Sequence, residues 1–496
     1  MSPEPAPTSD SNTIRWVIPP CPQRAARVYT VRLFSSLLGL RATVEEARPL
    51  DRDGIRTVLY GPIDDASDSK LFVIEPDLYF WSRVEAGSDI TPLGVSEWRG
   101  VPFPRWAESG VSRKSHAANT FVCPVDPIAA AFFLISRIEE WRSEKVDQHG
   151  RYPADEAWMT RMGLLERPLV HEFAAIFAEW LGIEDPFAAA CAQWPNGHPF
   201  AVAFTHDIDR LRMHGNFWQD ARATFGALRF RGGLSIAARR VASGIAVRIG
   251  GRKDPYDTFD ELSAGHHSSG NLATYFWICA RKSAKNADYA GDSPRAGAMI
   301  SVLRDAGHEI ALHGTFDSFE NGDLLREEKE ALASVALAAV TSSRQHYLRF
   351  RASVTWQVQE EAGLTADSTL GFAGRLGFRA GLAVPFQPWD FTRSQPYNLW
   401  EVPMVMMDVT AREYMGLRPG EAIARSQRIL AQVERVGGAV AVLWHNSSLN
   451  DLDWRGWRSV YQSWLEAART QNAWGATIRQ IVEARSSFLR DLGSES

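Results

Sequence analysis

The sequence predicts an α/β protein in which a smaller α+β domain precedes a larger domain of repeated β–α units. Three observations lead to this fold class. The chain has 496 residues, which is too long for one ordinary hydrophobic core. Apolar runs alternate with amphipathic segments from residue 199 onward, as in a parallel sheet or barrel. Polar residues follow several of these runs, and such folds place function at the carboxyl ends of their strands.

The N-terminal part, residues 13–195, mixes short strands with helices. Residues 1–12 are rich in proline and serine, and we expect a disordered tail there. Hydrophobic periodicity then predicts, in order, the helix Ala25–Leu40, the strands Arg56–Tyr60 and Leu71–Ile74, and the helices Pro127–Ile135 and Val170–Trp180. Prolines and a glycine interrupt the chain at residues 194–199, so we place the domain boundary between residues 195 and 196.

The C-terminal part, residues 196–496, alternates strands and helices. The same criteria predict, in order, the strand Pro199–Phe204, the strand Asn271–Ile278, the helix Ser293–Ala306, the strand His308–Leu312, the helices Leu324–Ala339 and Gly420–Val436, and the strand Ala439–Trp444. A regular alternation of this kind predicts parallel strands joined by helices.

Two carboxylates directly follow the first strand of this part. Asp207 and Asp209 are two positions apart, so in an extended chain they point to the same side. Carboxylates held close together are costly unless a cation or a shared proton compensates their charge. The pattern therefore indicates metal-assisted acid–base chemistry.

A histidine and a further carboxylate extend this candidate site. His313 follows another predicted strand, and a helical turn would align it with Asp317, four residues later. Together with Asp209 they form a ligand set suited to zinc, manganese, iron or nickel. The alternative for Asp317 is that it caps the segment that follows it.

Further candidates are less specific. His445 follows the last predicted strand, and a lone histidine there is more often structural. Arg344 and Arg379 flank predicted loops, where they would orient a carboxylate, bind substrate oxygens or form surface ion pairs.

Composition excludes several classes of protein. A net charge of −5 and a pI near 6.2 give no general attraction to nucleic acid. The four cysteines form no CxxC pair, which argues against a zinc knuckle and a disulfide framework. Neither a signal-peptide pattern nor an apolar run long enough for a membrane span is present, so we expect a cytoplasmic protein.

Four motifs, in this order, resemble the polysaccharide deacetylase family, which is carbohydrate esterase family four with the nodulation-type deacetylase homology domain. They are Asp207-Ile208-Asp209, Gly307 to His313, Arg344-Gln345-His346-Tyr347 and Leu443-Trp444-His445. The resemblance covers roughly residues 199–450. The N-terminal part resembles an uncharacterised domain that precedes the catalytic domain in some bacterial members.

This resemblance implies a distorted (β/α) barrel and the metal-dependent removal of an acetyl group from an N-acetyl sugar. Asp207 is similar to the catalytic base, and His445 is similar to the general acid. Asp209 and His313 are similar to metal ligands, and Arg344 to the arginine of the Arg-x-Pro-aromatic motif. The implied cofactor is a divalent ion, zinc first, with manganese, iron, nickel or cobalt as alternatives.

Other assignments complete this hypothesis. We expect Asp317 as the third metal ligand, at the position where the family has a second histidine. We expect Arg379 to pair with Asp207 and keep it ionised. Arg344, His346 and Tyr347 are expected to bind substrate, with a main-chain N–H of this segment facing the oxyanion. His346 replaces the usual proline of its motif.

The expected substrate is a carbohydrate, either polymeric or a lipid-linked precursor. Two alternatives stay open: an inactive glycan-binding module of the same fold, and a metal-dependent amidase that acts on a small amide. An aromatic-lined groove would favour the polymer, and a closed pocket would favour the small amide. Trp356, Trp389 and Trp400 lie near the motifs and are candidates for stacking on sugar rings.

One basic stretch stands apart from these motifs. Residues 222–253 contain many arginines interleaved with apolar residues. This pattern is typical of a peripheral helix at an anionic membrane surface or against an anionic glycan. The alternative, which we favour from the sequence alone, is an insertion packed on the barrel with a solvated basic face.

Overall fold

The computed structural model of the chain describes most of its residues. These are residues 12–47, 55–62, 71–106, 120–215, 220–222, 224–225, 233–281, 283 and 285–493. The tail expected at residues 1–12 lies outside them except for its last residue. None of the helices in the described part is long and apolar enough to cross a membrane.

The N-terminal part is a small α/β region built on a parallel five-stranded sheet, in the order β2-β1-β3-β4-β7. The sequence predicts an α+β domain here, but the main sheet is parallel, so this part is better described as α/β. Among its described strands, the only antiparallel pair is the hairpin β5–β6. The strands are β1 (Thr13–Val17), β2 (Arg41–Glu45), β3 (Arg56–Tyr60), β4 (Leu71–Ile74), β5 (Gly94–Trp98), β6 (Val101–Arg105) and β7 (Thr120–Val122).

Helices cover this first sheet and continue beyond it. They are α1 (Arg24–Leu37), α2 (Leu78–Ala86), α3 (Pro127–Ile135), α4 (Ile138–Trp141), α5 (Trp158–Arg161), α6 (Leu169–Trp180) and α7 (Ala188–Cys191). Helix α3 is buried along its whole length, as its apolar sequence predicts. It begins at Pro127 behind Asp126, whose carboxylate accepts the N–H groups of Ile128 and Ala129.

The C-terminal part is built on a curled sheet in which every strand pair is parallel. Its order is β15-β12-β11-β10-β9-β8-β17-β16, with β18 beside β8. This is the distorted (β/α) barrel architecture expected from the sequence. The strands are β8 (Ala201–Ile208), β9 (Ala273–Trp277), β10 (Glu309–Gly314), β11 (Ser342–Gln345), β12 (Ala366–Asp367), β15 (Trp400–Glu401), β16 (Met404–Met407), β17 (Ala439–Leu443) and β18 (Trp474–Gly475), and a small hairpin adds β13 (Trp389–Asp390) and β14 (Gln395–Pro396).

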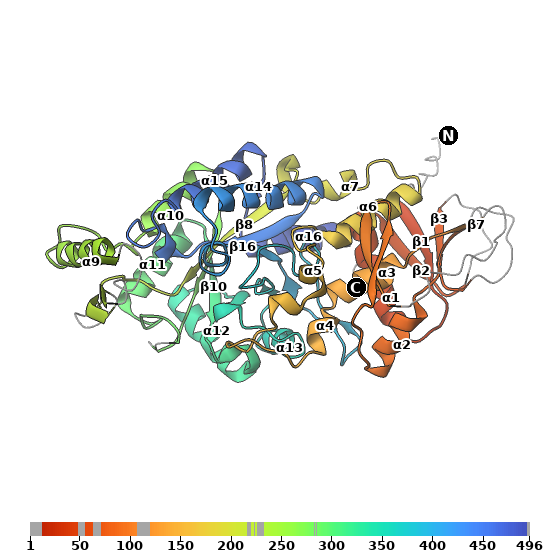
Figure 1. Cartoon of the computed structure of the whole chain (residues 1–496), viewed down its shortest axis with the longest axis horizontal. Helices are drawn as coiled ribbons and strands as arrows, with labels where there is room; N and C mark the ends of the chain where they lie inside the picture. Colours follow the sequence, from red (N-terminus) through yellow and green to blue (C-terminus); the bar gives the residue numbers. More distant parts are fainter. Residues whose placement is uncertain are drawn as a thin grey trace, which may run out of the picture.

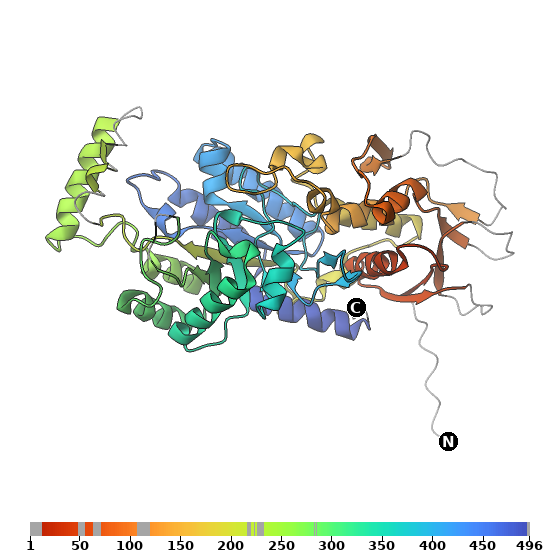
Figure 2. The ribbon, with the colours of Figure 1, turned by 90° about the horizontal axis from the view of Figure 1, so that it is seen from below.

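Helices lie around the outside of this curled sheet, and α11 and α12 pack directly on β10 (Figure 1). The described helices of this part are α9 (Gly233–Arg248), α10 (Phe259–Ser268), α11 (Pro294–Asp305), α12 (Gly322–Ala336), α13 (Thr355–Glu361), α14 (Pro419–Arg435), α15 (Arg458–Thr470) and α16 (Ile478–Asp491). Helix α9 projects from the end of the molecule opposite the N-terminal sheet (Figures 1 and 2).

The two parts share one buried core. A single apolar cluster includes Trp16 of the first sheet and Phe204 of the second. Across the junction, the Tyr29 hydroxyl donates to the Gln387 carbonyl at 2.7 Å. The division at residue 195 remains a prediction, although the strands of the two sheets do lie on either side of it.

Candidate active site

Polar side chains from five strands meet at the carboxyl ends of the curled sheet. Asp207 lies in β8 and Asp209 directly after it, and the other contributing strands are β10, β11, β17 and β16. Because all these strands are parallel, their carboxyl ends lie at one edge, and residues far apart in sequence become neighbours. This edge is where the sequence predicts the functional residues.

Asp207 is held by a buried arginine. Nη1 of Arg344 donates to Asp207 Oδ1 at 2.9 Å and to Thr205 Oγ1 at 2.7 Å. The rest of the guanidinium donates to the carbonyl and the hydroxyl of Ser368. Arg344 is completely buried, so it orients Asp207 and is not available to bind substrate, contrary to the expectation. The ion pair keeps the Asp207 carboxylate fixed with one oxygen committed.

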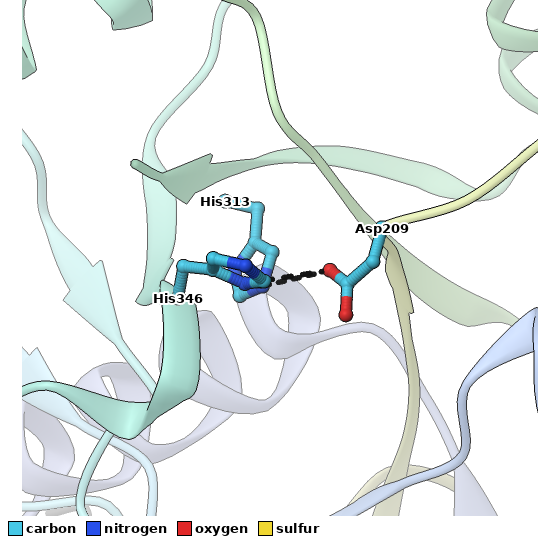
Figure 3. Close-up of side chains that lie close together, drawn as sticks. All are labelled: Asp209, His313 and His346. Atoms are coloured by element: carbon cyan, nitrogen blue, oxygen red, sulfur yellow. Dashed lines mark hydrogen bonds and ion pairs between the residues drawn. The ribbon is translucent and has the colours of Figure 1, made fainter. Parts of the chain in front are cut away.

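Asp209, His313 and His346 form the only group of three or more metal-ligating side chains with closely spaced donor atoms in the described part of the chain. His313 Nε2 lies 3.3 Å from Asp209 Oδ1, and His346 Nδ1 lies 3.5 Å from the same oxygen. The two imidazoles come from β10 and from the end of β11, and both face the carboxylate (Figure 3). The proximity of Asp209 and His313 is therefore confirmed.

The donor atoms of this trio fit a divalent metal ion. His313 Nδ1 donates to the Arg344 carbonyl at 2.9 Å, which leaves Nε2 as the basic nitrogen of the neutral ring. Asp209 Oδ1 is buried and accepts no hydrogen bond from the described residues. Two ring nitrogens and one carboxylate oxygen are a common ligand set for zinc and related ions.

The surroundings of the trio also keep the Asp209 carboxylate ionised. Burial alone would raise the pKa of Asp209, but the imidazoles of His346, His313 and His445 outweigh burial and hold it far below its usual range. Burial lowers the pKa of His346 to about 4, so its ring stays neutral near pH 7 and can act as a ligand.

His445 forms a second functional unit with Asp408. The His445 ring donates through Nδ1 to Asp408 Oδ1 at 2.7 Å, and its main-chain N–H donates to Oδ2 at 2.9 Å. Its Nε2 lies 3.7 Å from Asp209 Oδ2. Burial would lower the pKa of His445, but the adjacent Asp408 carboxylate, with smaller contributions from Asp209 and Asp207, raises it to about 10. The His445 imidazole is therefore held in its protonated form near neutral pH.

Asp317 does not join the metal-ligating trio, so the expectation for it is wrong. Its side chain is 68% exposed and lies 3.9 Å from Arg349. Strand β10 continues to Gly314, and Glu328 then binds the main chain and side chain of Thr315. The chain therefore turns away where a helical turn was expected. Asp317 precedes the short helix at Ser318–Glu320 but makes no capping bond with its side chain, so the capping alternative also fails.

Arg379 does not pair with Asp207, and this expectation is wrong as well. Its guanidinium binds Glu140 of α4, with Nε 2.9 Å from Oε1, and also donates to the Gly371 carbonyl. Glu140 simultaneously binds Arg137. This buried ionic cluster joins the N-terminal part to the C-terminal part, and the role expected of Arg379 falls to Arg344.

The acidic and histidine side chains line one pocket of about 190 Å³. Asp207, Asp209, His313, His346 and His445 all contribute to its wall. Tyr347 and Tyr414 contribute aromatic rings, and Arg151 of the N-terminal part lines it as well. Of the three residues expected to bind substrate, only Tyr347 and His346 reach this pocket. The N-terminal part therefore supplies a portion of the pocket wall.

The loop that carries His346 is stabilised by the N-terminal part. Tyr347 has a φ of 60°, a conformation that bulky residues rarely adopt. Arg151 Nη1 donates to the Tyr347 carbonyl at 2.7 Å, and the His149 ring stacks on the Tyr347 ring with centroids 5.1 Å apart. Asp147 in turn fixes Arg151 through a 2.8 Å contact with its Nε. These contacts compensate the strain of the loop.

The three tryptophan candidates lie away from the pocket, and so does His206, the neighbour of Asp207 in sequence. His206 points to the opposite side of β8, where its ring lies 2.8 Å from the His266 ring. Trp356 and Trp389 are buried in the core, and Trp400 lines a separate cavity of about 500 Å³ beside α1. None of these tryptophans lines the pocket of the candidate site, so none is placed to stack on a sugar bound there.

Asp408, Arg151 and the ligand position of His346 were missed by the sequence reasoning. Asp408 follows the apolar run Met404–Met407, the same signal that identified Asp207 and Asp209, so it could have been found. Arg151 lies far from the other site residues in sequence, and no local signal marks it.

Comparison with known proteins gives one match to a family. Residues 21–186 match a family of unknown function, DUF7033. No curated protein matches the chain.

Several solved structures are similar to the chain. A Mycobacterium smegmatis protein assigned to the polysaccharide deacetylases is 21% identical, with a TM-score of 0.40, over 59% of this chain and 92% of that one. A family 4 carbohydrate esterase from Streptomyces lividans is 12% identical, with a TM-score of 0.26, over 56% and 91%. A family 4 pseudoenzyme from Bacillus anthracis is 9% identical, with a TM-score of 0.30, over 57% and 66%.

Proposed function

We propose that this protein is a metal-dependent hydrolase that removes an acyl group, typically acetyl, from the amide nitrogen of a carbohydrate. The observation that carries the proposal is the convergence of three units on one pocket. They are a carboxylate oriented by an arginine, a metal-ligating trio, and an imidazole oriented by a carboxylate. A base, a cation site and an acid around one small cavity are the components that amide hydrolysis needs.

The cation would be held by Asp209, His313 and His346. When bound, a divalent ion of the zinc, manganese, iron, nickel or cobalt type supplies Lewis acidity, which polarises an acyl carbonyl and lowers the pKa of water.

The chain's own residues supply the proton transfers. Asp207 Oδ2 lies 3.5 Å from His313 Nε2, while Oδ1 is occupied by Arg344, so Oδ2 is the oxygen that accepts the proton of the attacking water. His445 presents Nε2 to the pocket and donates its proton to the departing nitrogen, which leaves as a neutral amine. The main-chain N–H groups near Tyr347 are the candidates that stabilise the oxyanion.

The dimensions of the pocket define the part of the substrate that enters it. A volume of about 190 Å³ accommodates an acyl group with roughly one attached sugar ring, below the usual range of about 300–1,000 Å³ for larger ligands. This favours a monosaccharide unit, free or at the end of a lipid-linked or polymeric chain. The same small volume favours the second candidate, an amidase that acts on a small amide.

The decisive experiment is Asp207→Asn in the full chain. We expect acetate release from a panel of N-acetylated sugars and small amides to fall by roughly 10³-fold, while bound metal stays stoichiometric. The matched control is Asp323→Asn on the exposed start of α12, which should retain full activity. Residual activity above about a tenth in Asp207→Asn would refute the base assignment. Metal-free wild-type protein that binds glycans without hydrolysing them would instead identify a binding module.

A further inference from the structure

Helix α9 carries a stripe of large apolar side chains on its outward face. Leu234, Val241 and Ile245 are 81%, 50% and 57% exposed. Ile249 directly follows the helix, donates its N–H to the Ile245 carbonyl at 3.0 Å, and is 77% exposed. Spacings of seven, four and four residues place these side chains on one helical face. Contiguous exposed apolar side chains of this kind mark an interaction surface.

The opposite face of α9 is the one that holds the helix to the protein. Ser243 is buried and its hydroxyl lies 3.0 Å from His214 Nε2. Arg240 binds Asp453, with Nε 3.1 Å from Oδ1. The helix is therefore fixed through Ser243 and Arg240, and it stands out at the end of the molecule (Figure 2).

A groove beside α9 extends the apolar surface. It has a volume of about 460 Å³ and lies between the helix and four residues that precede it, Asp220, Ala221, Thr224 and Phe225. Phe225, Val241 and Ile245 line it, and Phe225 is 71% exposed. At its polar side, Arg248 binds Asp220 at 2.6 Å. The surface thus combines an apolar groove with a charged margin.

The chain segment that contains α9 is strongly basic. Residues 210–253 contain ten arginines or lysines and a single acidic residue, Asp220. Among the described residues, Arg240, Arg248 and Lys253 bind carboxylates, whereas Arg239 and Arg252 are exposed and bind none. Arginines that bind no carboxylate among the described residues, next to an exposed apolar stripe, complement a bilayer surface, in which anionic headgroups cover an apolar acyl-chain region.

A second copy of the chain is a poor partner for the same surface. Two copies related by a two-fold axis would place identical patches face to face. Each patch would then bring its own arginines against those of the other copy, and the carboxylates beside α9, Asp220 and Asp453, already bind Arg248 and Arg240. The charge therefore favours lipid over self-association.

We propose that α9 binds the surface of an anionic bilayer, with Leu234, Val241, Ile245 and Ile249 entering the boundary between headgroups and acyl chains. Arg239 and Arg252 contact lipid phosphates from the margin of the stripe. The proposal does not depend on the proposed catalytic activity, because α9 contributes no residue to the pocket of the candidate active site.

Vesicle co-sedimentation of the full chain tests this inference. We expect the wild type to sediment with vesicles that contain about one-third phosphatidylglycerol and not with pure phosphatidylcholine. Raising the salt from about 0.1 to about 0.5 M should weaken the binding. The triple variant Leu234→Ser/Ile245→Ser/Ile249→Ser should lose at least about tenfold in affinity, because the inserted apolar area is removed. Arg239→Glu should lose about fivefold or more.

Two control variants separate this effect from general changes of the surface. Val302→Ser removes an apolar side chain that is 66% exposed on α11, and Arg479→Glu reverses a charge on α16. Both should bind as the wild type does. Equal binding of the wild type to both kinds of vesicle, or unchanged binding by the triple variant, would overturn the proposal. A wild-type dimer in sedimentation velocity that the triple variant converts to monomer would also overturn it, since a second copy would then cover the stripe.

Discussion

Nη1 of Arg344 lies 2.9 Å from Oδ1 of Asp207, and the two buried residues come from strands separated by β9 and β10. The guanidinium crosses the interior of the curled sheet and rests 4.4 Å from the ring centroid of Phe276 on β9. A single arginine thus fixes the proposed base and fills the centre of the barrel.

Arg344→Ala should therefore destabilise the fold as well as abolish activity. Removing one partner leaves Asp207 buried and unpaired, which costs about 3–5 kcal/mol. Urea unfolding measures this loss as a shift of the midpoint. The control Arg375→Ala breaks a partly exposed pair with Asp155 and should cost less than about 1 kcal/mol. A loss below about 1 kcal/mol in Arg344→Ala would contradict the structural role of this pair.

Metal content should distinguish His346 from Asp317. We expect His346→Ala to weaken metal binding by about 100-fold or more, because it removes one of the three proposed ligands. Asp317→Ala should bind metal as the wild type does, because its carboxylate is exposed to solvent. Elemental analysis after dialysis against a weak chelator measures both. If Asp317→Ala lost metal and His346→Ala kept it, Asp317 would be the third ligand, as the sequence predicts.

Asp408→Asn should shift the alkaline limb of the pH–rate profile to lower pH. The Asp408 carboxylate raises the pKa of His445 to about 10, and a neutral amide removes that charge. A general acid works only below its pKa, so the wild type stays active until the pH approaches this value, whereas the variant loses activity nearer neutrality. The pH dependence of kcat, with metal content checked in parallel, measures the shift. Coincident alkaline limbs would exclude His445 as the acid.

Stability should fall as the pH drops below about 6.5, because several histidines are buried in the neutral form. Burial, reinforced by Arg485 and Arg435, lowers the pKa of His171 to about 3, and neither of its ring nitrogens has a hydrogen-bond partner in the described part of the chain. Burial also lowers the pKa of His206 to about 4. Between pH 6.5 and these values the unfolded chain binds more protons, so the stabilisation present above pH 6.5 is lost on acidification.

Each such histidine adds up to about 1.4 kcal/mol per pH unit to the slope of the unfolding free energy against pH. His171→Phe should remove the contribution of one histidine from this slope. Urea unfolding at a series of pH values gives the slope. Phe187→Leu, which alters the ring packed 6.0 Å from His171, should lower stability at every pH without changing the slope. An identical slope in His171→Phe and the wild type would refute the assignment.

Much of the architecture could be predicted from hydrophobic periodicity. Helix α3 has the predicted bounds, and β17 and α14 lie within one residue of theirs. Asp207 and Asp209 were found because a buried apolar strand ends in two carboxylates, which is physically costly and therefore informative. The same reasoning would have found Asp408 after β16.

What escaped prediction depends on tertiary contacts. Strand β11 is polar, Ser342-Ser343-Arg344-Gln345, and it is buried because its side chains bind partners such as Glu309 and Asp367. Apolar patterning cannot detect such a strand, so the position of His346 at its end was missed. The partner of Arg379 is Glu140, 239 residues earlier in the chain, and no local spacing encodes that pair.

The contact of Arg151 with the Tyr347 carbonyl limits how far the N-terminal part and the C-terminal part can change independently of each other. A loop that carries a ligand candidate is braced by a residue encoded nearly two hundred positions away, in the region that matches DUF7033. The N-terminal part therefore cannot be exchanged for another domain without loss of this support for the loop. Excision of the N-terminal part would remove this hydrogen bond and leave the loop free to relax out of its strained shape.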